Sequence, residues 1–225
     1  MLIPFRASDG NRNCLLTHRF CRICKTMLPF CPAKPMLPIS NLESVLVKSK
    51  TIAEVLKKAP DLHVPNWYVG AGAIAPTVWN ELHGYPLDHG LKDCDLVYFD
   101  GDISSETQNV YRQRSHELFA SLPVEVELTN EARVHIWYKE KFGKDIKPYI
   151  STEDAINTWP TTATSVGVRY RNGTFQVYAP YGLHDLLSMI VRPNKTLVPR
   201  EVYEKKAERW KSGWPKLEVI AWDGM

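Results

Sequence analysis

The sequence predicts an α+β fold in which helices flank a mixed β-sheet. Residues 96–99 are four consecutive apolar residues, one β-branched and two aromatic, as expected for a buried strand. Residues 124–128 show a second strand pattern, and residues 166–178 a hairpin that turns at Asn172–Gly173, a favoured type I′ pair. Helical patterns separate these segments. The hairpin either extends the sheet or begins a small second lobe.

The elements before the first long strand are predicted in order. Apolar residues recur with helical spacing over residues 42–59. Residues 67–74 indicate a short strand that enters a turn of small residues. A helix is predicted over residues 76–82, with Pro76 in its first turn, where a missing N–H is harmless. Residues 82–91 then form a loop that leads to the strand.

The later helices have recognisable ends. Ser105 and Gln108 form a predicted capping box at the start of a helix over residues 105–122. A helix over residues 131–142 is expected to stop at Gly143. Three further helices are expected over residues 151–158, 183–191 and 201–210.

Two aspartates, Asp93 and Asp95, stand at the head of the apolar run. Residues i and i+2 of a strand point to the same face, so the two carboxylates should lie side by side. Their charges repel, and a divalent cation removes that conflict. Hard oxygen ligands suit Mg²⁺, which often binds through one or two carboxylates and substrate phosphates.

A glycine turn precedes the aspartates. Gly70, Gly72 and Ala73 lie where a short strand meets a helix. Such a turn lets a phosphate approach the backbone, and the N-terminus of a helix favours an anion. The alternative is that the glycines only permit close packing.

These motifs together resemble the polymerase-beta-like nucleotidyltransferase superfamily: a Gly-small-Gly helix start, Asp-x-Asp on a strand, and a third acid on a later strand. The chain is most similar to a little-characterised group of small nucleotidyltransferase-like proteins, and the resemblance covers roughly residues 42–218. Its matching blocks are residues 67–74, 93–100, 130–138 and 159–169.

The resemblance implies a metal-dependent phosphoryl transfer with Mg²⁺ or Mn²⁺. Its first two acids match Asp93 and Asp95, and its third matches Glu127, between Val126 and Leu128. Glu125 shares the strand face of Glu127 and remains an alternative. Gly72 and Asp93 are 21 positions apart, longer than the usual spacing, which weakens the case for a phosphate site at Gly72.

Further substrate contacts are expected from four polar residues. Arg133 and Arg169 could bind phosphate, and the hydroxyls of Thr164 and Ser165 could bind a base or sugar. The alternatives are a salt bridge for Arg133, a polar loop for the hydroxyls, and a surface position for Arg169.

Charge is uneven along the 225 residues, whose net charge is +3. Residues 1–36 contain six basic and one acidic residue, and the remaining chain has 22 basic and 24 acidic residues. The body is therefore slightly acidic, which argues against a long nucleic acid as substrate. No stretch approaches the ~20 apolar residues that a membrane helix needs.

Residues 1–40 are expected to be a flexible, basic leader rich in proline, with the nucleotidyltransferase-like domain over residues 41–225. Three interpretations of the leader stay open: a zinc site, an organelle transit peptide within residues 1–36, and a segment upstream of a start at Met27 or Met36. The candidate zinc ligands are Cys14, Cys21, Cys24 and Cys31.

The sequence thus predicts an enzyme that moves a nucleoside monophosphate from a nucleoside triphosphate to an unknown small-molecule or protein acceptor. A cytoplasmic location is expected unless the leader directs import. The alternative function is a catalytically inactive relative that binds a nucleotide or a protein and regulates it. The acceptor, the preferred nucleotide and the oligomeric state stay open.

Overall fold

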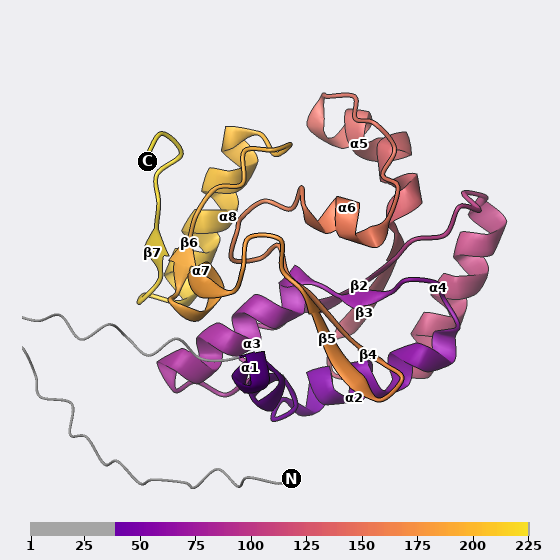
Figure 1. Cartoon of the computed structure of the whole chain (residues 1–225), viewed down its shortest axis with the longest axis horizontal. Coiled ribbons are helices and arrows are strands. Elements are labelled where there is room, and N and C mark those ends of the chain that lie inside the picture. The colour runs from indigo at the N-terminus through magenta and orange to yellow at the C-terminus, as the bar shows by residue number, and fades with distance from the viewer. Residues whose placement is uncertain (1–38, 225) are drawn as a thin grey trace, which may run out of the picture. The chain divides into compact units, whose positions relative to one another are not determined.

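A five-stranded mixed sheet organises the structure, a computed structural model that describes residues 39–224. Its strand order is β3-β2-β1-β4-β5 (Figure 1). Strands β2 and β3 run parallel, and the other neighbours are antiparallel. The strands are β1 (Tyr68–Val69), β2 (Asp93–Tyr98), β3 (Glu125–Asn130), β4 (Gly167–Arg171) and β5 (Thr174–Tyr178). The expected mixed sheet is confirmed, and the hairpin extends it.

Helices lie on both sides of this sheet. Figure 1 shows α1 to α4 on one side, α5 and α6 on the other, and α8 beside α3, against which it packs. The first group is α1 (Ile39–Leu46), α2 (Lys50–Lys58), α3 (Ala71–His83) and α4 (Ser105–Phe119). The second group is α5 (Val134–Phe142) and α6 (Thr152–Ile156), and α8 spans Arg200–Gly213. The remaining elements are η1 (Ala59–Leu62), η2 (Glu131–Arg133), α7 (His184–Leu187), β6 (Ile190–Val191) and β7 (Glu218–Val219).

The two faces of the sheet differ in chemistry because alternate residues of a strand point to opposite sides. On β2, Cys94, Leu96 and Tyr98 join the main apolar core. Asp93 and Asp95 therefore lie on the opposite face, together with Val97. Helix α4 connects β2 to the parallel strand β3, as a crossover between parallel strands requires.

Two helix boundaries in the first half differ from the prediction. The helix expected over residues 42–59 is broken at Ser49, whose hydroxyl accepts the N–H of Ile52 and donates to Asp88. Helix α3 begins at Ala71, directly after Gly70, so Pro76 lies inside the helix and not in its first turn. A loop leads to β2 as expected, but α3 extends to His83, so the loop begins at the C-cap Gly84 and not at residue 82.

Other boundaries differ by a few residues. Ser104, not Ser105, caps α4 by accepting the N–H of Thr107. Residues 131–133 form a 3₁₀ turn before α5, which ends at Gly143 as expected. The type I′ turn is confirmed, because Asn172 and Gly173 have φ values of 53° and 73°.

A second, two-stranded sheet was not expected. Residues 183–191 form only the short helix α7, because the chain leaves helical geometry at Met189 (φ 59°) and enters β6. Strand β6 then pairs in parallel with β7. Among residues 39–224, no helix is both long and apolar enough to cross a bilayer. The predictions for the leader fall largely outside these residues.

Candidate active site

Three candidate acids share the polar face of the sheet. In the parallel pairing of β2 with β3, Asp95 lies opposite Glu127 and Asp93 lies opposite Glu125. Neighbouring strands are about 4.8 Å apart, so these four side chains leave the sheet as one group. The structure therefore places the predicted acids on one face of neighbouring strands, with Glu125 on the same face.

The N-terminus of α3 contacts this group through Gly72. The backbone N–H of Gly72 donates to Oδ2 of Asp95 at 3.0 Å. A Cβ atom on residue 72 would lie 2.2 Å from that oxygen, a distance that real Cβ atoms do not adopt. Glycine is thus required here by close approach to a carboxylate. Ala73 donates its N–H to the carbonyl of Gly70, so that N–H is used within the helix.

Gly70 is a second position of close approach. Its N–H donates to the carbonyl of Asp95 at 2.7 Å, and a Cβ would lie 2.6 Å from the Trp159 ring. The packing interpretation of this glycine is supported. Trp159 precedes the loop of Thr161–Ser165 and lies against the turn that contacts Asp95.

The electrostatics of the acids show that they are mutually repulsive. Burial and the charge of Asp93 raise the pKa of Asp95, against opposing effects of the Gly72 hydrogen bond and Lys206. Burial and the charges of Asp95, Asp93 and Glu125 also raise the pKa of Glu127. A cation bound among these groups would offset the repulsion and lower the pKa of both Asp95 and Glu127.

A further acid, Glu131, was not singled out from the sequence. It is 5% exposed, and it follows β3 at the same parity as Glu125 and Glu127. Burial raises its pKa to about 8, and the charge of Asp95 contributes. The period of two along residues 125–131 was the signal that could have identified it.

Arg169 lies on the polar face, because Val168 on the apolar face pairs with Val69. It is 8% exposed, and its guanidinium lies 4.2 Å from the centroid of the Tyr68 ring. Its Nε donates to Gln176 at 2.9 Å. Arg169 is therefore a nearly buried residue, not a surface arginine.

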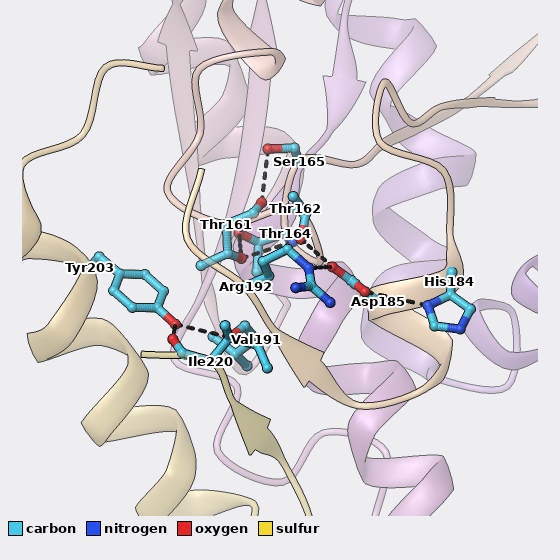
Figure 2. A network of polar contacts seen from close by, with 10 residues as sticks. All are labelled: Thr161, Thr162, Thr164, Ser165, His184, Asp185, Val191, Arg192, Tyr203 and Ile220. Atoms are coloured by element: carbon cyan, nitrogen blue, oxygen red, sulfur yellow. Dashed lines mark hydrogen bonds and ion pairs between the residues drawn. The ribbon is translucent and has the colours of Figure 1, made fainter. Parts of the chain in front are cut away.

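The hydroxyls of Thr164 and Ser165 bond inside their own loop. Thr164 shares a hydrogen bond with the hydroxyl of Thr161, and Ser165 donates to the Thr161 carbonyl at 2.9 Å (Figure 2). Both residues are buried. The polar-loop interpretation is supported, and a substrate contact by either hydroxyl stays a prediction.

The same loop is tied to α7 by a second set of bonds in Figure 2, which also includes Arg192, the residue after β6. Asp185 accepts from the hydroxyl of Thr162 at 2.6 Å and from Nε of Arg192 at 3.0 Å. Arg133 donates to the carbonyl of Ile103 in the loop before α4, and phosphate binding by Arg133 stays a prediction.

The chain matches the family model described as "Nucleotidyltransferase" over residues 57–219. The protein belongs to this nucleotidyltransferase family. A solved structure described as revealing "a CCA-adding enzyme head domain" matches with a TM-score of 0.66 and 27% identity. The match covers 81% of this chain and 95% of that one. No curated protein matches the chain.

This nucleotidyltransferase has a donor set that fits a hard divalent cation, namely carboxylate oxygens on one sheet face. Within residues 39–224, however, no three His, Cys, Asp or Glu side chains are gathered closely enough to hold a metal ion as they stand. Oδ2 of Asp95 is held by Gly72, so the remaining oxygens of the group would have to converge on the cation.

Proposed function

We propose that this nucleotidyltransferase transfers a nucleoside monophosphate from a nucleoside triphosphate to a small-molecule or protein acceptor. The register that sets Asp95 opposite Glu127, with Asp93 on the same face, carries this proposal. The chain's own acids would hold Mg²⁺ or Mn²⁺. When bound, two such cations would neutralise charge on the attacking and leaving oxygens.

The position of each acid on the sheet sets its proposed role. Asp93 and Asp95 would hold the cations that neutralise the triphosphate, and Glu127 would orient the acceptor hydroxyl and take up its proton. The bond from the α-phosphorus to its bridging oxygen breaks as the acceptor oxygen attacks, and pyrophosphate leaves. Catalysis of this kind is mostly positioning and charge neutralisation.

A binding experiment tests whether the protein binds the nucleoside triphosphate donor. Calorimetry with a nonhydrolysable nucleoside triphosphate should show binding in Mg²⁺ that is lost in chelator and in Asp95→Asn. Binding that is indifferent to both metal and substitution would refute the proposal. Labelled nucleotides in cell extract would then identify the acceptor.

A matched pair of substitutions identifies the third acid. Glu127→Gln should abolish transfer and Glu125→Gln should reduce it only slightly, since Glu127 lies opposite Asp95 and feels the charges of both aspartates. The reverse ranking would assign the role to Glu125. Tight nucleotide binding without transfer to any acceptor would favour the regulatory alternative.

A further inference from the structure

Strand β3 is an edge strand of the large sheet, and a cavity of about 1100 Å³ lies along it. Helix α4 forms the opposite wall of this cavity, through residues between Asn109 and Phe119. Residues 125–129 of β3 line it, including both Glu125 and Glu127, and no residue of β2 does. The cavity therefore borders the third candidate acid from the open edge of the sheet.

The backbone of β3 has outward-facing groups along this edge. The backbone of Asp95 faces β1, because its carbonyl accepts the N–H of Gly70, the residue after β1. Backbone groups alternate in direction along a strand, so the even-numbered residues of β2 face β3. In a parallel pair each of them bonds to the two residues that flank its partner, which are odd-numbered in this register. The N–H and C=O groups of Val126 and Leu128 therefore point away from β2.

A contact with α4 agrees with this direction. The Leu128 carbonyl accepts from Nε of Arg112 at 3.4 Å, a bond made from outside the sheet. Both Leu128 and Val126 line the cavity. An open strand edge of this kind is a template for pairing with another extended chain.

A buried hydroxyl of the cavity also lacks a partner. Ser115 of α4 lines the cavity and is 1% exposed, and its Oγ has no hydrogen-bond partner within residues 39–224. An unpaired buried hydroxyl is unfavourable, and a polar group of a ligand in the cavity would relieve it. Both walls thus present polar groups that a bound chain would satisfy.

We propose that an extended segment of an acceptor protein pairs with β3 in this cavity and places a serine or threonine hydroxyl beside Glu127. This inference rests on the proposed function and names the class of its acceptor. Directly opposed residues of neighbouring strands project to the same face of a sheet, about 5 Å apart. A segment residue opposite Glu127 would therefore continue the row of Asp95 and Glu127 on the polar face.

Charge on the same face selects the segment further. The residues two positions from that hydroxyl share its face, and one of them would lie opposite Glu125. Glu125 is exposed and forms no salt bridge with any of residues 39–224. A lysine or arginine at that position would pair with Glu125, so we expect the segment to be basic.

In the transfer step, the oxygen of the segment's hydroxyl bonds to the α-phosphorus of the triphosphate, and its proton goes to Glu127. The bond from the α-phosphorus to its bridging oxygen breaks, and the electron pair leaves with pyrophosphate.

An oriented library of synthetic nonapeptides with a central serine tests the inference by capture on the immobilised protein. The captured peptides should be enriched in lysine or arginine two positions from the serine. Glu125→Lys should shift this preference to aspartate or glutamate. In Mg²⁺, labelled nucleoside triphosphates should then label the central serine of the selected peptide and leave its alanine counterpart unlabelled.

A matched pair of proline substitutions tests the pairing itself. Val126→Pro removes an outward N–H of β3, where proline is tolerated because no bond to β2 is lost. It should weaken calorimetric binding of the selected peptide about tenfold or more. Val177→Pro is the control on β5, the other edge strand, since the alternation from the two-residue turn also points the Val177 N–H outward. It should bind the peptide like wild type.

The outcomes separate the two proposals. Capture of no peptide, or equal peptide affinities of Val126→Pro and Val177→Pro, overturns this inference and leaves the proposed function standing if the triphosphate still binds. Dimerisation of the free protein that Val126→Pro abolishes would assign the edge to a second copy and also overturn it. Failure of the wild-type protein to bind the triphosphate overturns both. If Val126→Pro does not fold by thermal unfolding, the Glu125→Lys library decides, and an unchanged preference overturns the inference.

Discussion

The N–H of Gly72 donates to Oδ2 of Asp95 at 3.0 Å, so the anion nearest this first turn of α3 is one of the protein's own carboxylates. A helix N-terminus favours negative charge, and here it orients an acid of the site. The sequence had suggested a substrate phosphate for the same position. Gly72 therefore positions Asp95, and a direct phosphate contact by Gly72 stays a prediction.

The first prediction concerns Gly72→Ala. The added Cβ would lie 2.2 Å from Oδ2 of Asp95, so the carboxylate must move away from its hydrogen bond. We expect transfer activity to fall at least a hundredfold, with a stability loss of about 1–3 kcal/mol. Kinetics and denaturant unfolding measure the two effects.

Gly213→Ala is the control for this substitution, because a Cβ there meets no atom within 4 Å. It should leave activity unchanged. Equal activities of the two variants would show that the position of Asp95 is not set by Gly72.

A second prediction concerns pH. The unfolded chain ionises Glu131 near its ordinary pKa of 4.5, whereas the folded protein holds that proton until about pH 8. The folded state therefore binds more protons between these values, and stability in chelator should fall as pH rises through this window. The buried charge costs of the order of a few kcal/mol at pH 8.

Glu131→Gln removes this titration, so the variant should lose much less Tm than wild type between pH 5 and pH 8. Glu140→Gln, at an exposed position on α5, should keep the wild-type difference. Identical pH profiles for wild type and Glu131→Gln would contradict the assignment.

A third prediction tests Arg169 as a nucleotide ligand. It lies nearly buried on the face of the acids, stacked on Tyr68, and Nε is its only side-chain nitrogen with a hydrogen-bond partner among residues 39–224. Arg169→Met should weaken triphosphate binding about tenfold or more, since a charged hydrogen bond is lost. Arg171→Met, two residues along β4 and exposed, should bind like wild type. Equal affinities would limit Arg169 to a structural role.

A fourth prediction concerns the loop that carries Trp159. Asp185→Asn weakens the bonds from Thr162 and Arg192 and should cost about 1–3 kcal/mol of unfolding free energy. Asp223→Asn, which alters an ion pair whose aspartate side chain is 74% exposed, should cost about 0–1 kcal/mol. Chemical denaturation of both variants measures the contrast, and similar losses would refute it.

Much of the sheet was predictable because its signals are local. The alternation around Asp93 and Asp95, the apolar neighbours of Glu127 and the Asn172–Gly173 turn each lie within a few residues of sequence. Strand periodicity then places the acids on one face without any knowledge of the remaining fold.

The errors arose where distant residues decide the local structure. Ser49 interrupts a helical pattern while its hydroxyl bonds to Asp88, 39 positions away. Strands β6 and β7 have two residues each, too few for a pattern, and exist through their mutual pairing. The position of α8 has no local motif, since it depends on the packing of Trp210 against Trp79.

During translation, helix α8 is synthesised after all five strands of the large sheet. A ribosome-bound chain that has emerged through β5 contains every acid of the site and all five strands of the large sheet, but α8 is still to follow. Such a nascent chain should be able to assemble the acidic face of the sheet while Trp79 of α3 still lacks its partner Trp210. The apolar core around α3 would then be completed only after α8 has docked.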